Sequence, residues 1–309
     1  MLKANISSIT RLRINEDGPG VRSVVFMCGC PLNCVWCCNP EICLSKSFKT
    51  LSVDELYGYI SKDIPYFVNS GGGITFSGGE PLLHTDYIKR FIDKYCNSFS
   101  VALETSLYTD ILNVESLYPL IDRWYVDFKV FDEQKHIEYT GVSNELIKSN
   151  LRFLSHNIDK EKIIITYPII PELNTSDDNL YNMMSLLSEL DIKNIELHPY
   201  RKIQEQKHRD VGLEPMAFNE TSAELYGCIK YNFLNNGFII PEQITYREKE
   251  KCKYLKAIRK QICADKDISL EIKDCVFEGR CAGICPRCEY ELEFINRALE
   301  NKKTNPDVF

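Results

Sequence analysis

The chain has 309 residues, 44% of them hydrophobic, and a formal net charge of −7 at pH 7. Its length suits one large domain with a smaller piece. The acidic balance argues against a general nucleic-acid or membrane-surface binder, because no large basic field is available. The N-terminal segment has no apolar region typical of a secretory signal, and no apolar run approaches the roughly 18 residues that cross a bilayer. We therefore expect a cytoplasmic protein.

Short apolar strands alternate with helical patterns along most of the chain. Runs of β-branched and aromatic residues predict six strands, at 21–28, 72–76, 100–105, 123–130, 162–170 and 194–200. Helical spacing of apolar residues predicts helices at 52–68, 84–97, 113–120, 144–157, 176–191 and 219–237. Ser52 and Glu55 have the spacing of a capping box, which marks the start of the first helix.

This alternation predicts parallel strands joined by right-handed crossovers. Six units are too few for a closed eight-fold barrel, so we predict an α/β fold with a partial, TIM-like (β/α)6 barrel over residues 1–240. In such barrels the chemistry lies at the carboxyl ends of the strands. After Pro241 the sequence becomes basic and cysteine-rich, and it predicts a small C-terminal cysteine-rich module over residues 241–309.

Twelve of the 14 cysteines form two groups, one toward each end of the chain. Cytoplasmic thiols stay reduced, so this density indicates metal or redox chemistry rather than disulfides. Three thiolates on one loop can hold three irons of a 4Fe-4S cluster and leave the fourth open, whereas a structural zinc site needs four protein ligands. A zinc site or free thiols remain the alternatives. The first group follows the first predicted strand and contains the spacing C-x3-C-x2-C at Cys30, Cys34 and Cys37, with Cys28, Cys38 and Cys43 around it.

The segment CPLNCVWC (30–37) resembles the signature of the radical S-adenosylmethionine (SAM) superfamily. Five segments resemble, in the same order, the activating enzymes of glycyl radical enzymes, over about residues 10–240: DGPGVRSVVFMCGCPLNCVWCCNPE, GGGITFSGGEPLL, LETS, DFKVFDEQKHIEYTGVSN and IELHPYRKIQEQKHRDVGLEP. The resemblance implies that Cys30, Cys34 and Cys37 hold a 4Fe-4S cluster whose open iron binds SAM. It implies reductive cleavage of SAM to methionine and a 5′-deoxyadenosyl radical, which abstracts a hydrogen atom.

The resemblance also implies SAM-binding roles for residues at the strand ends. Gly78 and Gly79 permit a close backbone approach that a Cβ would block. The Glu80 carboxylate can accept a hydrogen bond from the SAM ammonium group. Asp127 and Lys129 alternate on one strand and therefore share a face, and the family places them beside the ribose and carboxylate of SAM.

Two further positions match the family and two depart from it. Glu104 and Thr105 close a strand where family members make SAM or cation contacts, with a simple strand-end cap as the alternative. Thr166 stands where many activating enzymes carry Arg, and Arg201 where many carry His. We hypothesise that Arg201 replaces the missing cation and faces the SAM carboxylate. A solvated surface arginine is the alternative, since arginine is mostly exposed.

The second cysteine group lies in the C-terminal module. Four thiols could close a second 4Fe-4S cluster or a zinc site, or they could stay free. We hypothesise a cluster that relays an electron or anchors substrate. Part of the spacing resembles the SPASM or twitch auxiliary-cluster domains, whereas the ferredoxin-like insert that many activating enzymes carry is absent here. The predicted ligands are Cys275, Cys281, Cys285 and Cys288, spaced C-x5-C-x3-C-x2-C, with Cys252 and Cys263 as alternates.

The leading function is therefore radical SAM activation of a glycyl radical enzyme. The alternative is radical modification of a ribosomal peptide or small molecule with help from the auxiliary cluster. A non-catalytic iron–sulfur or zinc regulator is a third. A flavodoxin- or ferredoxin-type donor would supply the electron, and the basic stretch 247–260 could guide it, although a solvated helix face explains that stretch equally. We expect no nucleic-acid or membrane partner.

Overall fold

A computed structural model describes residues 2–44, 48–202, 205–216, 218–242, 249–273 and 284–304. Its centre is an eight-stranded sheet in the order β3-β1-β2-β4-β5-β6-β7-β8. Neighbouring strands from β2 to β8 are parallel, and β3 and β8 form the two edges. The sheet is therefore open, and the predicted α/β partial barrel is confirmed. Its six parallel strands are β2 (Val21–Met27), β4 (Gly73–Gly78), β5 (Ser100–Thr105), β6 (Arg123–Asp127), β7 (Ile163–Ile169) and β8 (Asn194–Pro199).

Two antiparallel strands extend the sheet beyond the predicted six. β1 (Lys3–Ile14) pairs with β2 on one side and with the short β3 (Lys49–Ser52) on the other. β1 mixes buried apolar positions such as Ile6 with many polar ones, and its register to β2 shifts twice. These irregularities break the strict alternation that marks a strand in sequence, so neither strand was predicted.

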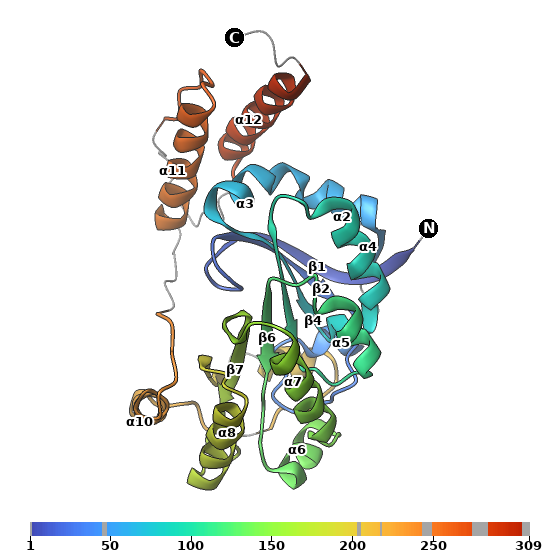
Figure 1. The fold of residues 1–309 in the computed structure, drawn as a ribbon, viewed down its shortest axis with the longest axis vertical. Helices are drawn as coiled ribbons and strands as arrows, with labels where there is room; N and C mark the ends of the chain where they lie inside the picture. Colours follow the sequence, from blue (N-terminus) through green and yellow to red (C-terminus); the bar gives the residue numbers. More distant parts are fainter. Residues whose placement is uncertain are drawn as a thin grey trace.

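Helices cover the outer face of the curved sheet (Figure 1). The capping box at Ser52 is confirmed, because the Ser52 hydroxyl accepts from Glu55 N at 3.2 Å and the Glu55 carboxylate accepts from Ser52 N at 2.7 Å. The single helix predicted over 52–68 is divided by a 3-10 turn at Ser61–Asp63. Pro65, which has no N–H to continue the first helix, lies in the first turn of the second one. The helices up to residue 242 are α1 (Pro40–Leu44), α2 (Val53–Ile60), α3 (Ile64–Ser70), α4 (Thr85–Tyr95), α5 (Ile111–Leu117), α6 (Glu133–Thr140), α7 (Glu145–Asn157), α8 (Asp177–Glu189), α9 (Glu205–Asp210) and α10 (Ala223–Asn235), with 3-10 turns η1 (Ser61–Asp63), η2 (Pro81–His84) and η3 (Lys160–Lys162).

The main core lies between the sheet and these helices. It is built from apolar residues of the parallel strands and the inward faces of the helices, among them Phe76, Phe91, Trp124 and Ile165, all fully buried. Parallel strands covered in this way are apolar on the helix side. Charged strand residues consequently turn toward the open inside of the barrel, where the site lies.

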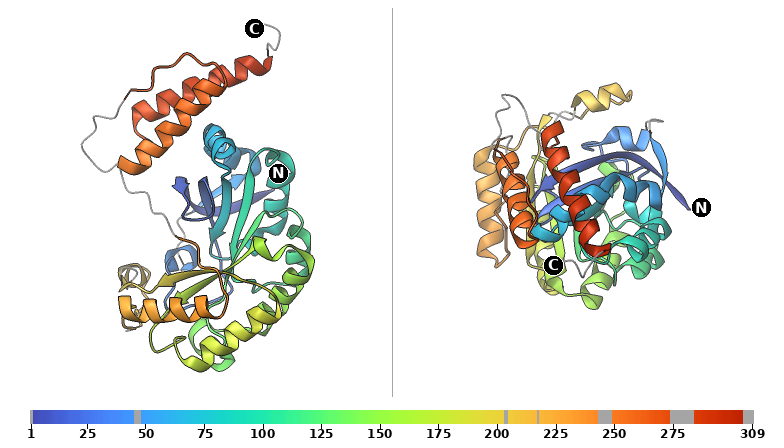
Figure 2. Two further views of the ribbon diagram at one scale, coloured as in Figure 1. Left: turned by 60° about the vertical axis from the view of Figure 1, so that its left-hand side comes forward. Right: turned by 90° about the horizontal axis from the view of Figure 1, so that it is seen from above.

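The C-terminal helices α11 (Lys249–Asp265) and α12 (Pro286–Thr304) lie together beyond α3 at one end of the molecule (Figures 1 and 2). They share a second apolar cluster with the barrel, in which Leu255 and Ile295 join Val21 and Tyr66. Val21 is the first residue of β2, so these helices pack at the amino ends of the parallel strands. Within the part of the chain that the structure describes, no helix is both long and apolar enough to cross a membrane.

Candidate metal and cofactor site

A cavity of about 590 Å³ opens at the carboxyl ends of the parallel strands. Cys30, Cys34 and Cys37 line it from the loop after β2, while charged residues line it from the ends of β5, β6 and β8. Its volume falls within the range of small-molecule and cofactor sites. The structure thus brings the three predicted cysteines of the first group and most of the predicted polar residues together around one space.

The glycines after β4 hold the cysteine loop in place. Gly79 N donates to Met27 O at 3.0 Å, and Glu80 N donates to Gly29 O at 2.8 Å. A Cβ on Gly79 would lie 2.0 Å from Gly29 O, and Gly78 has a φ of +113°. Both positions therefore require glycine, because two backbone segments touch there beside Cys30.

The other side of the cysteine loop rests on α6. Asn33 N donates to Thr140 O at 2.8 Å and Val35 N donates to Tyr139 O at 3.1 Å. Two carbonyl oxygens at the end of α6 thus accept hydrogen bonds from the loop. The buried Trp36 side chain belongs to a small apolar cluster with residues that follow β6 and β7. These contacts give the segment EYTGV a physical role, which is to fix the loop that carries the thiols.

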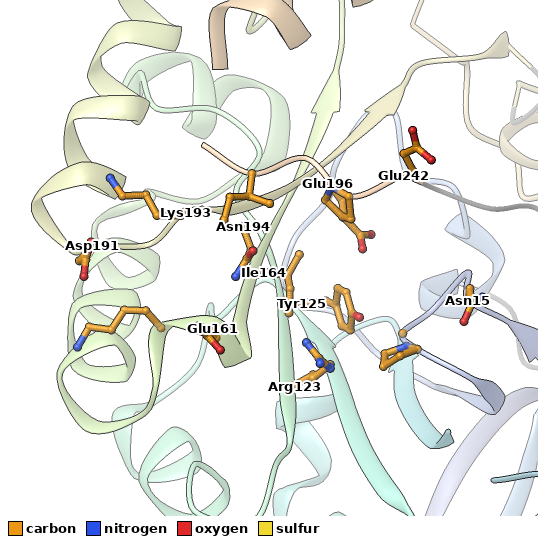
Figure 3. A pocket seen from close by; sticks show the side chains of 15 residues that line it. Asn15, Arg123, Tyr125, Glu161, Ile164, Asp191, Lys193, Asn194, Glu196 and Glu242 are labelled. Atoms are coloured by element: carbon orange, nitrogen blue, oxygen red, sulfur yellow. The ribbon is translucent and has the colours of Figure 1, made fainter. Parts of the chain in front are cut away.

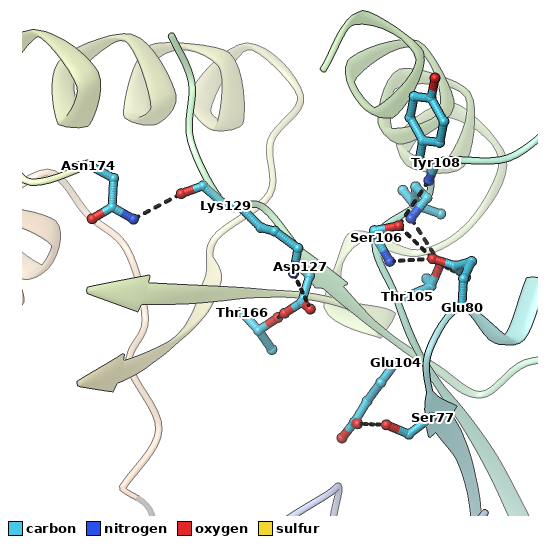
Figure 4. Close-up of polar contacts among 11 residues, drawn as sticks. Ser77, Glu80, Glu104, Thr105, Ser106, Tyr108, Asp127, Lys129, Thr166 and Asn174 are labelled. Carbon is cyan, nitrogen blue, oxygen red and sulfur yellow. Dashed lines mark hydrogen bonds and ion pairs between the residues drawn. The ribbon is translucent and has the colours of Figure 1, made fainter. Parts of the chain in front are cut away.

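Glu80 is buried in a cradle of hydrogen bonds behind the cavity (Figure 4). Its carboxylate accepts from Thr105 Oγ1 at 2.6 Å, from Ser106 Oγ at 2.5 Å, from Ser106 N at 2.9 Å and from Leu82 N at 3.1 Å. Burial raises the pKa of Glu80 although these bonds oppose it. Glu80 therefore ties the end of β4 to the end of β5. Its carboxylate is not part of the cavity wall, whereas Thr105 is.

Asp127 and Lys129 form an ion pair on the cavity wall, with 2.8 Å between Lys129 Nζ and Asp127 Oδ2. The Asp127 side chain is 45% exposed and that of Lys129 12%. Burial works against both charges, but the pair and a hydrogen bond from Thr166 Oγ1 outweigh it. Figure 4 shows the contacts of Asp127 with Lys129 and Thr166. The pKa of Asp127 is therefore lowered and that of Lys129 raised. The positive charge of Lys129 also acts on Cys34, so it can stabilise a thiolate at that position.

Glu104 belongs to a group of carboxylates inside the barrel. It accepts a hydrogen bond from Ser77 Oγ, and it faces Asp17, Asp127 and Glu196. Burial, followed by the repulsion of these carboxylates, raises the pKa of Glu104 to about 8. The carboxyl group therefore carries a proton at neutral pH until a cation enters the cavity, and a cationic ligand would release that proton.

Arg201 is not brought to the other predicted residues. Its side chain is exposed, and Nη1 donates to Thr221 O at 2.7 Å instead of lining the cavity. Thr166, which replaces a family arginine, instead contacts Asp127 from the next strand. The positive charge on this part of the wall is that of Lys129.

Cys43 is a site residue that the spacing did not reveal. It lies on α1, lines the same cavity, and its thiol interacts with those of Cys30 and Cys37. This neighbour lowers the pKa of the Cys37 thiol to about 7 despite its burial. Nothing in the C-x3-C-x2-C pattern predicts this contact, because it depends on how α1 folds back over the loop.

Two of the four C-terminal cysteines, Cys285 and Cys288, lie far from this cavity, next to each other at the start of α12. Cys275 and Cys281 fall outside the described residues. Cys288 Sγ accepts from Arg259 Nη2 at 3.5 Å, beside Tyr66 of α3. Cys285 and Cys288 are thus at the amino ends of the strands, and the seven residues of β2 alone span about 23 Å between the two ends.

Within the described ranges, no three His, Cys, Asp or Glu side chains converge closely enough to hold a single metal ion. A 4Fe-4S cluster places each thiolate on a different iron, so its ligands need not converge on one point. The three cysteines on one loop, open to a cavity and faced by Lys129, therefore fit such a cluster with a cofactor beside it.

A second cavity, of about 620 Å³, opens at the amino ends of β6, β7 and β8 (Figure 3). Charged groups of both signs surround it, including Arg123, Lys193 and Glu161. It shares Tyr125 and Glu196 with the cysteine-lined cavity. The inside of the open barrel is therefore polar from end to end, and the cysteines mark the carboxyl end as the reactive one.

The sequence pattern of the radical SAM superfamily matches residues 24–184, which is more than half of the chain. The chain is 32% identical to the trans-4-hydroxy-L-proline dehydratase activating enzyme of Clostridioides difficile, over 62% of this chain and 83% of that protein. It is 29% identical to the indoleacetate decarboxylase activating enzyme of Tractidigestivibacter scatoligenes, over 68% of this chain and 87% of that protein.

Solved structures agree at the level of the fold. A radical SAM methyltransferase from Sphaerobacter thermophilus superposes with a TM-score of 0.52 at 16% identity, over 71% of this chain and 65% of that chain. The sequence match, the two activating-enzyme relatives and the cysteine-lined cavity agree with one another. The chain belongs to the radical SAM superfamily and, within it, to the activating enzymes of glycyl radical enzymes.

Proposed function

We propose that this protein uses a 4Fe-4S cluster on Cys30, Cys34 and Cys37 to place a glycyl radical on a partner enzyme. One observation carries the proposal: the three thiols and the Asp127–Lys129 pair lie on the wall of one cavity at the carboxyl ends of the strands. The bound cluster and SAM would together supply the 5′-deoxyadenosyl radical that abstracts the hydrogen atom. The partner would be a large enzyme with a glycine loop, of the decarboxylase or dehydratase kind that the relatives' names describe.

The residues of this chain would bind and orient the cofactor. Asp127 has an exposed carboxylate that can accept hydrogen bonds from ribose hydroxyl groups, and Lys129 offers a cation to a carboxylate. Glu104 and Thr105 would contact SAM or a cation from the end of β5, where the acidic interior favours positive charge. The sulfonium and ammonium groups of SAM supply such charge.

The remaining predicted residues would act from outside the cavity wall. Gly78 and Gly79 would let the backbone of the cysteine loop, and the cofactor, come close to the end of β4. Glu80 would hold the ends of β4 and β5 at the right spacing. Arg201 keeps its proposed role toward the SAM carboxylate only if its side chain turns inward from Thr221 when SAM binds.

We further propose that residues 1–240 form the catalytic barrel and residues 241–309 a module with a second metal group on Cys275, Cys281, Cys285 and Cys288. A second 4Fe-4S cluster is the leading candidate and zinc the other. The position of Cys285 and Cys288 at the amino ends supports a structural role over electron relay or substrate anchoring. If replacing all four cysteines with alanine removes neither iron nor zinc from the protein, this proposal fails; unchanged iron alone excludes the second 4Fe-4S cluster.

A flavodoxin- or ferredoxin-type protein would deliver the electron. The basic helix α11 lies at the end of the molecule opposite the cysteine loop (Figure 1), so its charge does not support docking of that donor near the cluster. We propose a cytoplasmic location, because a chain with 14 cysteines and an oxygen-sensitive cluster needs a reducing compartment.

Anaerobic reconstitution tests the function directly. With dithionite and SAM, the protein should form 5′-deoxyadenosine, and Cys34→Ala should lose both this activity and the iron of the SAM-binding cluster. With a candidate partner enzyme added, electron paramagnetic resonance should detect a glycyl radical on the partner. A parent protein that holds iron but forms no 5′-deoxyadenosine would refute the proposal. A radical product on a short peptide in place of a glycyl radical would favour the peptide-modifying alternative.

A further inference from the structure

The segment that follows the last parallel strand reaches back to the cysteine loop. Lys207 of α9 donates from Nζ to Cys38 O at 2.9 Å and to Asn39 Oδ1 at 3.0 Å. It also pairs with Glu41 Oε1 at 2.9 Å. All three acceptors lie within four positions after Cys37, the last of the three proposed ligands. One ammonium group, which has three N–H donors, therefore meets three oxygen atoms at ordinary hydrogen-bond distances.

This contact joins two strand ends that the sheet keeps apart. α9 follows the edge strand β8, whereas the cysteine loop follows β2, and four strands lie between β2 and β8 in the sheet. Cys38 and Asn39 line the cavity from the loop, and His198 lines it from β8. Lys207 therefore connects the two ends of the row of parallel strands across the rim of the cavity.

The segment that carries α9 is fixed at its base. Tyr200 N donates to Thr221 Oγ1 at 2.8 Å, and Thr221 N donates to Tyr200 O at 3.2 Å. The Thr221 hydroxyl in turn donates to Ile169 O, at the end of β7, at 2.7 Å. Phe218 belongs to the apolar cluster that contains Trp36 of the cysteine loop. Because α9 extends from this fixed base, it can hold the loop in place.

The two ends of the cysteine loop are held in different ways. Backbone hydrogen bonds with β4 and α6 fix its first part, from Gly29 to Val35. After Cys37 the chain enters α1, whose five residues are too few for a helix that is stable without outside contacts. Gly29 N reaches Ile42 O of this helix only at 3.5 Å. The three shorter contacts of Lys207 therefore act on the part of the loop that needs them.

We propose that Lys207 is a positioning residue that closes the rim of the cavity and holds the Cys37 end of the loop in the geometry that binds the cluster. Its side chain is 45% exposed, and an exposed ion pair alone contributes little. Here the same ammonium group also donates to a backbone carbonyl and to an amide oxygen, and such charge-assisted bonds are stronger than neutral ones. The inference rests on the proposed function only in that Cys30, Cys34 and Cys37 must hold the cluster.

The test compares the parent with Lys207→Met, Lys207→Arg and Arg209→Met. Methionine keeps an unbranched side chain and removes the charge. Arg209→Met is the matched control, because Arg209 lies on the same helix, is 50% exposed and pairs with Glu205 within α9. Hydrogen exchange of residues 38–44 is measured in iron-free protein. The rate at which iron passes to an excess of chelator is measured after anaerobic reconstitution.

In Lys207→Met, both the exchange of residues 38–44 and the release of iron should be about tenfold faster than in the parent, as expected for the loss of about one charge-assisted hydrogen bond. Exchange in α7 should stay that of the parent, whereas a side chain that only stabilised the fold would raise exchange throughout the barrel. Lys207→Arg should lie between, because a planar guanidinium cannot direct its donors at three acceptors around one point. Arg209→Met should match the parent.

Four outcomes would overturn the inference. Parent-like exchange of residues 38–44 in Lys207→Met would show that the three contacts do not hold α1. Faster exchange with parent-like iron release would show that Lys207 holds α1 without positioning the ligands. Equal acceleration in Arg209→Met would assign the effect to the charge of α9. A parent that takes up no iron would refute the proposed function and this inference together, whereas the first three outcomes leave the proposed function standing.

Discussion

At the scale of single residues, Glu104 links the stability of the barrel to pH. Burial and neighbouring carboxylates raise its pKa to about 8 from an ordinary value of 4.5. The folded protein therefore holds this proton more tightly than the unfolded chain does. Between these two pKa values the unfolded chain binds fewer protons, so this group lowers stability as pH rises.

The prediction concerns Glu104→Gln, which removes the titration and keeps the shape. Relative to this variant, the cofactor-free parent should lose stability as pH rises from 4.5 to about 8, by at most about 1.4 kcal/mol per pH unit. Thermal unfolding under anaerobic conditions at pH 5.5 and pH 8.5 measures the difference between the two proteins. A difference that does not grow with pH would show that Glu104 is ionised in the empty cavity.

The role of Thr166 could not be predicted from its residue type. The sequence comparison shows only that a threonine, without charge, stands where many activating enzymes have an arginine. In the structure the Thr166 hydroxyl donates to Asp127, and together with Lys129 it keeps that carboxylate ionised. Position 166 thus supports the charge of Asp127 through a hydroxyl group and not through a cation.

At the scale of elements, the parallel strands were predictable because each is a short apolar run followed by a helix of regular period. The edge strands β1 and β3 were not, because they lack that alternation, and α1 and α9 were not, because they are five and six residues long. Spacing singled out Cys30, Cys34 and Cys37, which the structure places on the wall of one cavity. The Cys43 contact could not be predicted, since it is made by α1 folding back onto the loop.

The element-scale prediction concerns the junction between β4 and the cysteine loop. In Gly79→Ala the new Cβ would lie 2.0 Å from Gly29 O, so the loop must shift. We expect this variant to fold but to bind less than half of the parent's iron at the SAM-binding cluster after reconstitution, because Cys30 adjoins the displaced backbone.

Gly227→Ala on α10 is the matched control, since nothing lies within 4 Å of a Cβ built there. This control should keep its iron and gain about 0.5–1 kcal/mol of stability, because alanine is the better helix former. Equal iron in Gly79→Ala and the parent would show that the loop adapts and that the glycine serves another purpose.

At the scale of the whole molecule, the C-terminal helices are attached to the barrel by buried charge as well as by apolar packing. Arg259 on α11 pairs with Glu291 on α12 at 2.9 Å and hydrogen-bonds to Tyr66 on α3, and all three are buried. Exposed pairs contribute little, whereas breaking a buried pair leaves an uncompensated charge and costs about 3–5 kcal/mol. Arg259 therefore links both C-terminal helices to the barrel.

Arg259→Met should release α11 and α12 while leaving the distant cysteine loop intact. Glu291 would keep its pair with Arg287, at 3.3 Å, so we expect a loss of stability near the lower end of that range, about 3 kcal/mol. Hydrogen exchange in the two helices should then be about a hundredfold faster, since every 1.4 kcal/mol corresponds to a factor of ten. The control is Arg297→Met, which removes an exposed ion pair with Glu293 and should change hydrogen exchange little. Arg259→Met/Glu291→Met should recover most of the loss, because an apolar pair leaves no buried charge.

Iron at the SAM-binding cluster should be unchanged in all three variants, because these charges lie at the amino ends of the strands and the cysteine loop lies at the carboxyl ends. Loss of that iron in Arg259→Met would instead mean that the C-terminal helices hold the cysteine loop in place through the sheet.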